Sequence, residues 1–319
     1  MKKLILRVLP LIDLICVPLV YPSAWLLKQI RRAGVQRLPK CKNALLQVGV
    51  FPIRDHYYEP QFNHQHSKRA FSEDRSLRGI DWNANEQERW LTKLVFAQEL
   101  SDLPQEKPST LDFYVRNETF TEGDAEYWYQ MIRTVRPRRI FEVGSGNSTL
   151  MAAKAIRRNK NEDATYGCEH VCIEPFEMPW LEEIGVSVVR KKVEDIDISF
   201  FSQLQENDIL FIDSSHIIRP QGDVLFEYLE ILPALNIGVI VHIHDIFSPK
   251  NYREDWLKDY VRFWNEQYLL EAFLSYNSSW KIVGALNYLH HNHYARLKGV
   301  APFLTPESVP GSFYMQRIA

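Results

Sequence analysis

Acidic and imidazole side chains come together at two points in the second half of the chain. Asp213 is followed three residues later by His216, and His244 is followed directly by Asp245. Each group follows an apolar run of the kind that forms a buried strand. Carboxylates bind hard divalent cations, imidazoles bind softer ones, and histidine can act as a general base. Together the two groups favour a catalytic cluster over the alternative, in which the histidines satisfy buried hydrogen bonds and Asp213 caps a helix.

A glycine-rich turn lies upstream of this cluster. The apolar run at residues 140–143 ends in Gly144 and Gly146, and a helix start rich in Ser and Thr follows. A buried parallel strand turns into a helix in this way, and the glycines let backbone amides approach a ligand. Asn147 or Ser148 is expected to cap the helix. Because such turns are common, the residues that follow decide what this one binds.

Carboxylates near the turn indicate the ligand. Glu174 ends the next predicted strand, where it could accept hydrogen bonds from both hydroxyls of a ribose, and Glu194 is expected to face an adenine. A dinucleotide site normally has a third glycine, and Glu142 would repel a pyrophosphate but suits the ammonium group of a methionine. The balance favours S-adenosyl-L-methionine over a nicotinamide dinucleotide. The predicted cofactor-binding residues are Glu142, Gly144, Ser145, Gly146, Asn147, Ser148, Glu174, Glu194 and Asp213.

Strand-like and helix-like segments alternate through the second half of the chain, which predicts an α/β fold with a doubly wound, Rossmann-like, mostly parallel sheet of seven strands. The last two strands suggest an antiparallel edge. Strands are expected near residues 139–143, 170–175, 186–193, 208–213, 238–243, 280–286 and 312–317. Helices are expected near residues 85–100, 123–135, 223–232 and 256–274.

The composition divides the chain into three parts. Residues 119–319 carry the cofactor-binding pattern, and residues 1–38 form an apolar N-terminal segment. Residues 39–118 are rich in aromatic residues and largely irregular before the first expected helix. Long irregular segments in compact proteins are often functional, and the aromatic content argues against disorder. This middle part is therefore expected to be either a cap over a substrate pocket or an arm packed on the core.

The apolar stretch at residues 4–27 is long enough for a membrane-spanning helix. Pro10, Pro18 and Pro22 are expected to kink or break such a helix. Basic residues flank the stretch on both sides, and the preference of basic residues for the cytoplasm then holds both ends inside. Three alternatives stay open: a broken helix packed on the protein, a shallow attachment to the inner face of the membrane, and a true span.

Composition excludes some classes of partner. The 319 residues are 24% charged with a net charge of −2, and there is no basic stripe of the kind that binds nucleic acid. The four cysteines have no zinc-binding spacing and indicate free thiols in a reducing compartment, hence a cytoplasmic protein. The expected partners are a small-molecule or glycan acceptor and, through residues 4–27, a membrane surface, while a homo-oligomer stays open.

The motifs around the predicted site resemble those of class I S-adenosylmethionine-dependent methyltransferases. The matching segments are Glu-Val-Gly-Ser-Gly-Asn-Ser-Thr at 142–149, Cys-Ile-Glu-Pro at 172–175 and Phe-Ile-Asp-Ser-Ser-His at 211–216. More narrowly they are similar to a bacterial family that includes macrolide sugar O-methyltransferases and cephalosporin hydroxylase-like proteins. The resemblance covers about residues 120–319. Residues 49–60, 242–247 and 264–270 further resemble a subfamily of uncharacterised bacterial proteins.

The resemblance implies roles for the acidic and imidazole cluster. In the sugar O-methyltransferases an Asp-x-x-His element supplies a magnesium ligand and the base, which maps onto Asp213 and His216. An acidic pair supplies the other ligands and maps onto His244 and Asp245. Since His244 stands where a carboxylate is expected, a softer ion such as manganese becomes an alternative to magnesium. The implied catalytic residues are His216, Asp213 and His244, and the implied metal ligands are Asp213, His244 and Asp245.

The expected function is therefore transfer of a methyl group to a hydroxyl of a sugar, glycan or secondary metabolite, with assistance from a metal. One rival is a metal-dependent hydroxylase on the same fold, in which His216, His244 and either Asp213 or Asp245 hold iron. A second rival is a protein that binds the cofactor without turnover.

Overall fold

The computed structural model describes residues 2–108, 111–176 and 178–319. The chain divides into two compact units, residues 1–69 and residues 70–319. We call them unit 1 and unit 2 and describe each by itself.

Unit 1 consists of two helices and an irregular arm. α1 (Lys2–Ala33) is one continuous helix with Pro10, Pro18 and Pro22 inside it, so of the expected kink or break, the break is wrong. Its segment Val8–Ala33 is long and apolar enough to cross a membrane. α2 (Pro39–Val48) occupies a stretch that was expected to be irregular, and it begins, as helices often do, with a proline in its first turn.

An ion-pair network fixes the arm of unit 1 to the end of α1. The Arg31 guanidinium donates to both carboxylate oxygens of Glu59, each at 2.8 Å, and also lies over the ring of Phe51. Arg54 donates to the same carboxylate at 3.4 Å. Glu59 therefore connects the end of α1 to Arg54 of the aromatic-rich arm.

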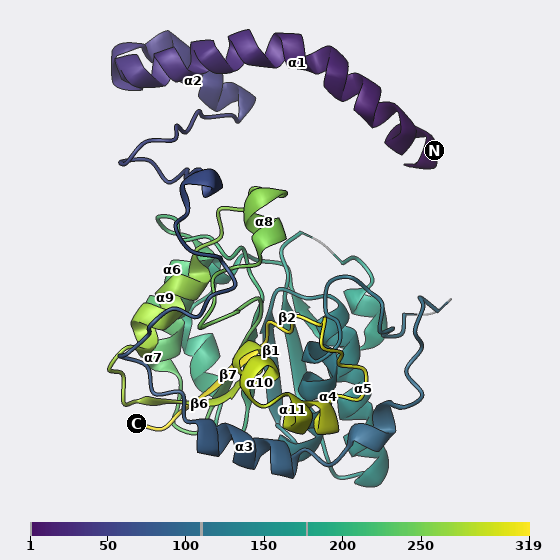
Figure 1. The fold of residues 1–319 in the computed structure, drawn as a ribbon. Coiled ribbons are helices and arrows are strands. Elements are labelled where there is room, and N and C mark those ends of the chain that lie inside the picture. Colours follow the sequence, from purple (N-terminus) through teal and green to yellow (C-terminus); the bar gives the residue numbers. More distant parts are fainter. Residues whose placement is uncertain (1, 109–110, 177) are drawn as a thin grey trace. The chain divides into compact units, whose positions relative to one another are not determined.

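Unit 2 is built on a seven-stranded sheet with strand order β3-β2-β1-β4-β5-β7-β6 (Figure 1). The first five strands in this order are parallel, and β7 is antiparallel to both of its neighbours. The predicted doubly wound sheet with an antiparallel edge is therefore confirmed. The strands are β1 (Arg139–Val143), β2 (Glu169–Ile173), β3 (Ser187–Val189), β4 (Ile209–Ile212), β5 (Ile240–Ile243), β6 (Trp280–Ala285) and β7 (Phe313–Arg317).

The helices of unit 2 agree in part with those expected from the sequence. They are α3 (Ala84–Lys93), α4 (Asp124–Val135), α5 (Asn147–Glu162), α6 (Asp223–Phe226), α7 (Leu232–Ala234), α8 (Glu254–Lys258), α9 (Glu266–Leu274), α10 (Leu286–Asn292) and α11 (Tyr294–Val300). A π-helical turn at Glu227–Ile231 joins α6 to α7. The single helix expected at 256–274 is wrong, because irregular chain separates α8 from α9. The helix expected at 85–100 ends at Lys93.

Alternate residues of the strands face two separate cores. On one side, strand residues such as Ile140 and Phe211 pack with α3, α4, α5, α10 and α11. On the other side, Phe141 and Leu210 pack with α6, α7 and α9. Both faces of the sheet are covered, which is why the strands read as continuous apolar runs.

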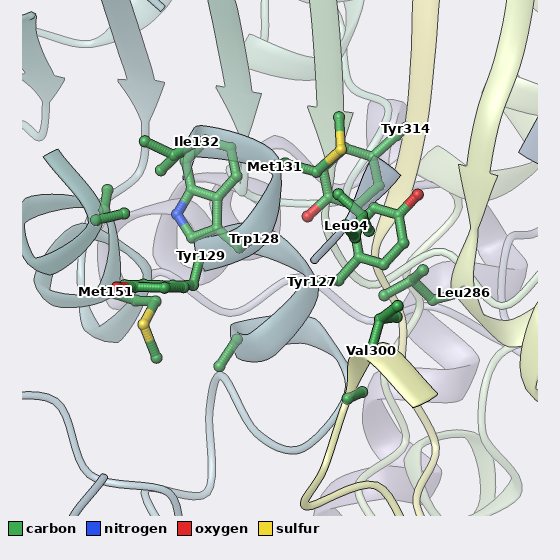
Figure 2. Close-up of a cluster of buried hydrophobic side chains, with 14 of the residues drawn as sticks. Leu94, Tyr127, Trp128, Tyr129, Met131, Ile132, Met151, Leu286, Val300 and Tyr314 are labelled. Carbon is green, nitrogen blue, oxygen red and sulfur yellow. The ribbon is translucent and has the colours of Figure 1, made fainter. Parts of the chain in front are cut away.

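Aromatic residues of α4 form the centre of the first core (Figure 2). Tyr127 and Trp128 are fully buried, and the Tyr127 ring lies 4.9 Å from that of Tyr314 on β7. The indole of Trp128 also donates to the backbone carbonyl of Ser148 in the first turn of α5, at 3.2 Å. Replacing such a side chain by alanine costs about 3–5 kcal/mol. This packing fixes α4 and α5 against the strands that carry the candidate site.

Candidate active site

The glycine turn after β1 packs directly on the end of β4. Gly144 has a φ of +80°, and a Cβ atom there would lie 2.0 Å from the carbonyl oxygen of Asp213. Only glycine fits this position without moving the backbone. Gly146 differs, because its φ of 172° is extended and a Cβ would meet only the Met178 side chain at 3.9 Å. The two glycines are therefore not equivalent: Gly144 is needed for packing, whereas Gly146 leaves room beside the turn.

The predicted cap of α5 is wrong in detail. The helix begins at Asn147 with Gly146 as its N-cap, so neither Asn147 nor Ser148 caps it. Instead the Thr149 hydroxyl accepts a hydrogen bond from the Gly146 N–H at 3.1 Å and donates to Glu142 at 2.5 Å. A side chain inside the first turn thus performs the capping that a residue before the helix usually performs.

Glu142 lies beneath the turn. It is fully buried, and its second carboxylate oxygen is 3.0 Å from His170 Nε2 on β2. Both oxygens are therefore engaged by the protein. Through these two contacts Glu142 connects the first turn of α5 to β2 and holds the glycine turn in place.

Two cavities open beside the turn, and both reach Asp213. The first, of about 400 Å³, is lined by Gly144, Glu174 and Glu194, with Ser214 among its other walls. The second, also of about 400 Å³, is lined on the turn side by four of the predicted residues, Ser145, Gly146, Asn147 and Ser148. The structure thus gathers every predicted cofactor-binding residue except Glu142 around two adjoining spaces. Together they suit an elongated ligand that passes over the turn.

The acidic and imidazole groups converge at the ends of β4 and β5. Parallel pairing of Ile212 with Ile243 sets Asp213 beside His244, the residue that follows each. His244 Nδ1 lies 3.6 Å from one oxygen of Asp213 and 3.6 Å from one oxygen of Asp245. These distances exceed a hydrogen bond, and this buried nitrogen has no hydrogen-bond partner among the described residues. A cation between these groups would satisfy it.

His216 closes the cluster from the loop after β4. Its Nε2 lies 3.2 Å from Asp213 and 3.6 Å from Asp245. Asp213, His216 and Asp245 each offer an atom, all within 4.8 Å of one another, which is compatible with one metal ion. His216 and Asp245 both have positive φ angles, 60° and 59°. Non-glycine residues adopt this conformation at an energetic cost, and such residues concentrate at functional sites.

A buried carboxylate lies behind each of the two histidines, within hydrogen-bond distance of His216 and farther from His244. Glu266, the first residue of α9, lies 2.7 Å from His216 Nδ1 and also accepts from the Tyr228 hydroxyl at 3.1 Å. Asp124, the first residue of α4, lies 3.6 Å from His244 Nε2 and accepts from the backbone N–H groups of residues 311 and 312. Both histidines therefore present their other ring nitrogen to the space between Asp213 and Asp245. Carboxylates in this position commonly orient histidines in metal and acid–base sites.

The burial of this cluster shifts its titration. Burial raises the pKa of Asp213, but His244 and His216 outweigh it and hold that pKa well below its usual range. Burial lowers the pKa of His216, but Asp213 and Glu266 raise it well above the ordinary value. His244 behaves similarly, because Asp245 and Asp213 outweigh its burial. In contrast, burial raises the pKa of Asp245.

A third histidine, His242, has a purely structural role and differs from the two histidines of the cluster. His242 points into the core from β5, with its ring 4.1 Å from that of Tyr314, and its Nε2 lies 2.8 Å from the Ser312 hydroxyl. Burial and the neighbouring His244 lower its pKa well below the ordinary value. His242 is thus a neutral core residue, whereas His244, two residues later, faces carboxylates.

Two members of the site were missed in the sequence. Glu266 lies within residues 264–270, a segment already singled out, but it is 50 residues from His216. Asp124 looks like an ordinary acid in the first turn of a helix, where it would offset the helix dipole. Neither has a neighbour in sequence that indicates its partner. Only the sheet brings them to their histidines.

Comparisons with known proteins agree with this architecture. Residues 141–246 match the model of a family described as a methyltransferase domain. An uncharacterised protein of Archaeoglobus fulgidus is 30% identical over 177 residues, which span 51% of this chain and 78% of that protein.

Similar solved structures are more distant. An O-methyltransferase from Bacillus cereus in complex with SAH is 12% identical with a TM-score of 0.36, and the match covers 76% of this chain and 100% of that one. A TDP-rhamnose 3'-O-methyltransferase of calicheamicin biosynthesis is 14% identical with a TM-score of 0.40, covering 76% and 99%.

The matched family model runs from β1 to the first residues beyond β5, and it therefore includes the glycine turn, Glu174, Asp213 and Asp245. The Archaeoglobus fulgidus relative extends the match over most of its own length. The family match and the sheet lead to one conclusion: the chain carries a methyltransferase domain and is a methyltransferase enzyme.

Proposed function

We propose that this methyltransferase moves the methyl group of S-adenosyl-L-methionine to a hydroxyl oxygen of a small-molecule or glycan acceptor. The observation that carries the proposal is the convergence of Asp213, His216, His244 and Asp245 beside the glycine turn. A methyltransferase that only aligned its substrates would not need two buried histidines facing two partly buried aspartates, since burying ionisable groups is costly.

The two cavities that share Asp213 support the cofactor assignment. Glu174 and Glu194 in the first cavity are placed to meet the ribose and adenine, and Ser145 and Asn147 in the second line the space for the methionine part. The Phe176 N–H donates to Glu174 at 3.1 Å, which holds that carboxylate at the end of β2. The sulfonium would then lie close to Asp213.

The residues at the ends of β4 and β5 fit a divalent metal. Asp213, His244 and Asp245 would hold it, and the unpartnered Nδ1 of His244 supports this choice. A mixed set of nitrogen and oxygen donors suits manganese as well as magnesium. When bound, such an ion would supply positive charge that favours ionisation of an acceptor hydroxyl.

His216 is the proposed general base. In the transfer the acceptor oxygen bonds to the methyl carbon, the carbon–sulfur bond breaks with its electron pair going to sulfur, and the hydroxyl proton goes to His216 Nε2. Glu266 on Nδ1 keeps the ring oriented and stabilises the imidazolium that forms. Without a cation, Asp213 and Glu266 favour the protonated ring, so the base role and the metal site depend on each other.

The same donors keep one rival open. His216, His244 and one of the two aspartates also form the two-histidine, one-carboxylate set of iron-dependent hydroxylases. Analysis of the bound metal separates the two functions. Iron together with hydroxylation of a substrate would support the hydroxylase, and manganese or magnesium together with methyl transfer would support the methyltransferase.

For the rest of the chain we propose that the catalytic unit lies in the cytoplasm and that unit 1 brings it to a membrane. The arm at residues 49–62 is proposed as a cap for the acceptor. The acceptor would then be a glycan or metabolite that reaches the membrane surface. The exposed apolar side chains of α1 support the membrane contact.

The test uses the purified full chain and radiolabelled S-adenosylmethionine with a cell extract as the source of acceptor. We expect bound metal, cofactor binding by calorimetry and label in an extract component. His216→Ala should keep cofactor and metal but lose roughly 10²–10⁴-fold in rate, whereas Asp213→Ala should lose the metal as well. His291→Ala, an exposed histidine of α10, is the matched control and should behave as wild type. An Asp213→Ala chain with full metal content and full activity would contradict the proposal.

A further inference from the structure

The apolar side chains of α1 cover the whole circumference of the helix. At about 100° per residue, Leu11, Ile12, Val20, Val17 and Leu14 point in directions of about 0°, 100°, 180°, 240° and 300°. All five are exposed, by 56%, 48%, 57%, 40% and 69%. A helix that lies on a membrane surface keeps one polar face, whereas a helix that is apolar all round belongs in a hydrophobic medium. We propose that α1 crosses a lipid bilayer.

The prolines inside α1 also support a location in the bilayer. Pro10, Pro18 and Pro22 lie inside the helix, and each removes a backbone hydrogen bond. In water, an exposed helix with three interior prolines would unfold, because water can hydrogen-bond to its backbone groups. In hydrocarbon the unwound chain has no water to bond to, so the helix persists and prolines are tolerated. The continuous helix therefore fits a bilayer better than an aqueous surface.

The length and the single interior charge are also compatible with a span. Residues 8–27 extend about 30 Å along the axis, the thickness of a hydrocarbon core. Asp13 is the charged residue in this stretch, and it lies about 8 Å from the Val8 end, where its carboxylate can reach the headgroups. A shallow re-entrant loop would need a turn near its middle, and α1 has none.

The flanking charges set the orientation. Before the span stand Lys2, Lys3 and Arg7, and a longer basic run follows it, namely Lys28, Arg31, Arg32, Arg37, Lys40 and Lys42. A span leaves only one of its flanks in the cytoplasm, so the expectation that both ends lie inside does not apply to it, and the flank with more basic residues stays inside. The N-terminus is therefore outside, and unit 2, with its free cysteines, is inside. The proposal does not depend on which acceptor the enzyme methylates.

The test expresses the full chain in bacterial cells and separates membranes by centrifugation. We expect the chain in the membrane pellet, where it resists an alkaline carbonate wash and yields to detergent. Ile15→Arg with Leu19→Arg should move at least tenfold more of it to the soluble fraction. The matched control is Leu46→Arg with Val48→Arg in α2, where both residues are exposed, and it should stay in the pellet. Release of the wild-type chain by carbonate, or a soluble wild-type chain, would overturn the proposal.

Labelling tests the crossing without relying on destabilised variants. Cys41 on α2 is a native, partly exposed thiol on the proposed cytoplasmic side. A membrane-impermeant maleimide should label Lys3→Cys in right-side-out vesicles and should reach Cys41 only after detergent is added. If neither site is labelled before detergent, or if Cys41 alone is labelled, the proposed crossing or its orientation is wrong. A mature chain whose mass shows that α1 has been cleaved off would also overturn it.

Discussion

The two halves of the sheet edge that carries the site are built differently. At the ends of β1 and β2, the proposed cofactor half relies on backbone shape at Gly144 and on the partly exposed Glu174 and Glu194. At the ends of β4 and β5, the proposed catalytic half relies on buried ionisable groups. Those groups need support from elements far away in sequence, as Glu266 shows for His216.

The difference teaches where local sequence is sufficient. A turn and a carboxylate at a strand end are local features, so spacing along the chain predicts them. A buried imidazole between carboxylates has a defined orientation only when something fixes its other nitrogen, because a wrong tautomer or ring position costs the function. The catalytic half is therefore a property of the assembled fold, and the predictions below probe this contrast.

The largest expected effect separates the two glycines of the turn. Gly144→Ala would force its Cβ against the Asp213 carbonyl and keep a left-handed φ, so we expect a loss of unfolding free energy of about 4 kcal/mol or more. Gly146→Ala is the matched control, and its cost should stay within about 1 kcal/mol. Urea unfolding of the full chain in mild detergent measures both. Equal losses for the two variants would mean that the turn does not pack on β4 as described.

The two glycines also show which features of the turn can be predicted from the sequence. Reading the two as one motif was correct for the turn, but the contact of Gly144 with Asp213 is invisible in the sequence because 69 positions separate the residues. The seven-stranded sheet and its antiparallel edge followed from alternating patterns, since the strands are short and buried on both faces. The boundaries of α8 and α9 did not, because tertiary contacts of Glu266 and Asn265 with the His216 loop decide where α9 begins.

The three prolines of α1 show the limit of a local pattern. Proline breaks a helix most readily where water competes for the freed carbonyl groups. The continuous helix indicates that the surroundings of a segment, which no local pattern records, determine how much a proline costs. Likewise, the contact of Glu142 with His170 on β2 cannot be read from the sequence, because 28 positions separate the two residues and only the sheet brings them together.

Next in size is the effect of the carboxylate behind the proposed base. Glu266→Gln keeps the shape but removes the charge beside His216 Nδ1, so we expect a loss of roughly 10²–10³-fold in kcat with little change in cofactor affinity. The pH profile of kcat should shift to lower pH, because Glu266 helps to raise the pKa of His216. Glu271→Gln on the same helix is the matched control. That residue binds Ser248 and Arg75, so it should affect stability and leave the pH profile unchanged.

A buried acid of α4 gives a pH dependence of similar size. Burial raises the pKa of Glu126 from 4.5 to about 7, although it accepts hydrogen bonds from the N–H groups of Gly123 and Phe303. The folded state therefore holds a proton that the unfolded state releases. Stability from this group is complete below pH 4.5 and falls as pH rises towards 7, by about 3 kcal/mol in total. Urea unfolding at pH 4.5 to 8 should show this slope in wild type but not in Glu126→Gln. Parallel curves would contradict the assignment.

The smallest expected effect lies in the cofactor half. If Glu174 accepts both ribose hydroxyls, Glu174→Ala should weaken binding of S-adenosylmethionine by on the order of 1.5–3 kcal/mol, the range for hydrogen bonds to a charged group. Its partial exposure places the value towards the lower end, because water competes for the carboxylate. Glu182→Ala, an exposed acid of the same region paired with Arg190, is the matched control and should bind normally. Calorimetry on the three chains decides the matter. Equal affinities would remove Glu174 from the cofactor site, and since the side chain supports little of the core, they could not be attributed to a compensating change in fold.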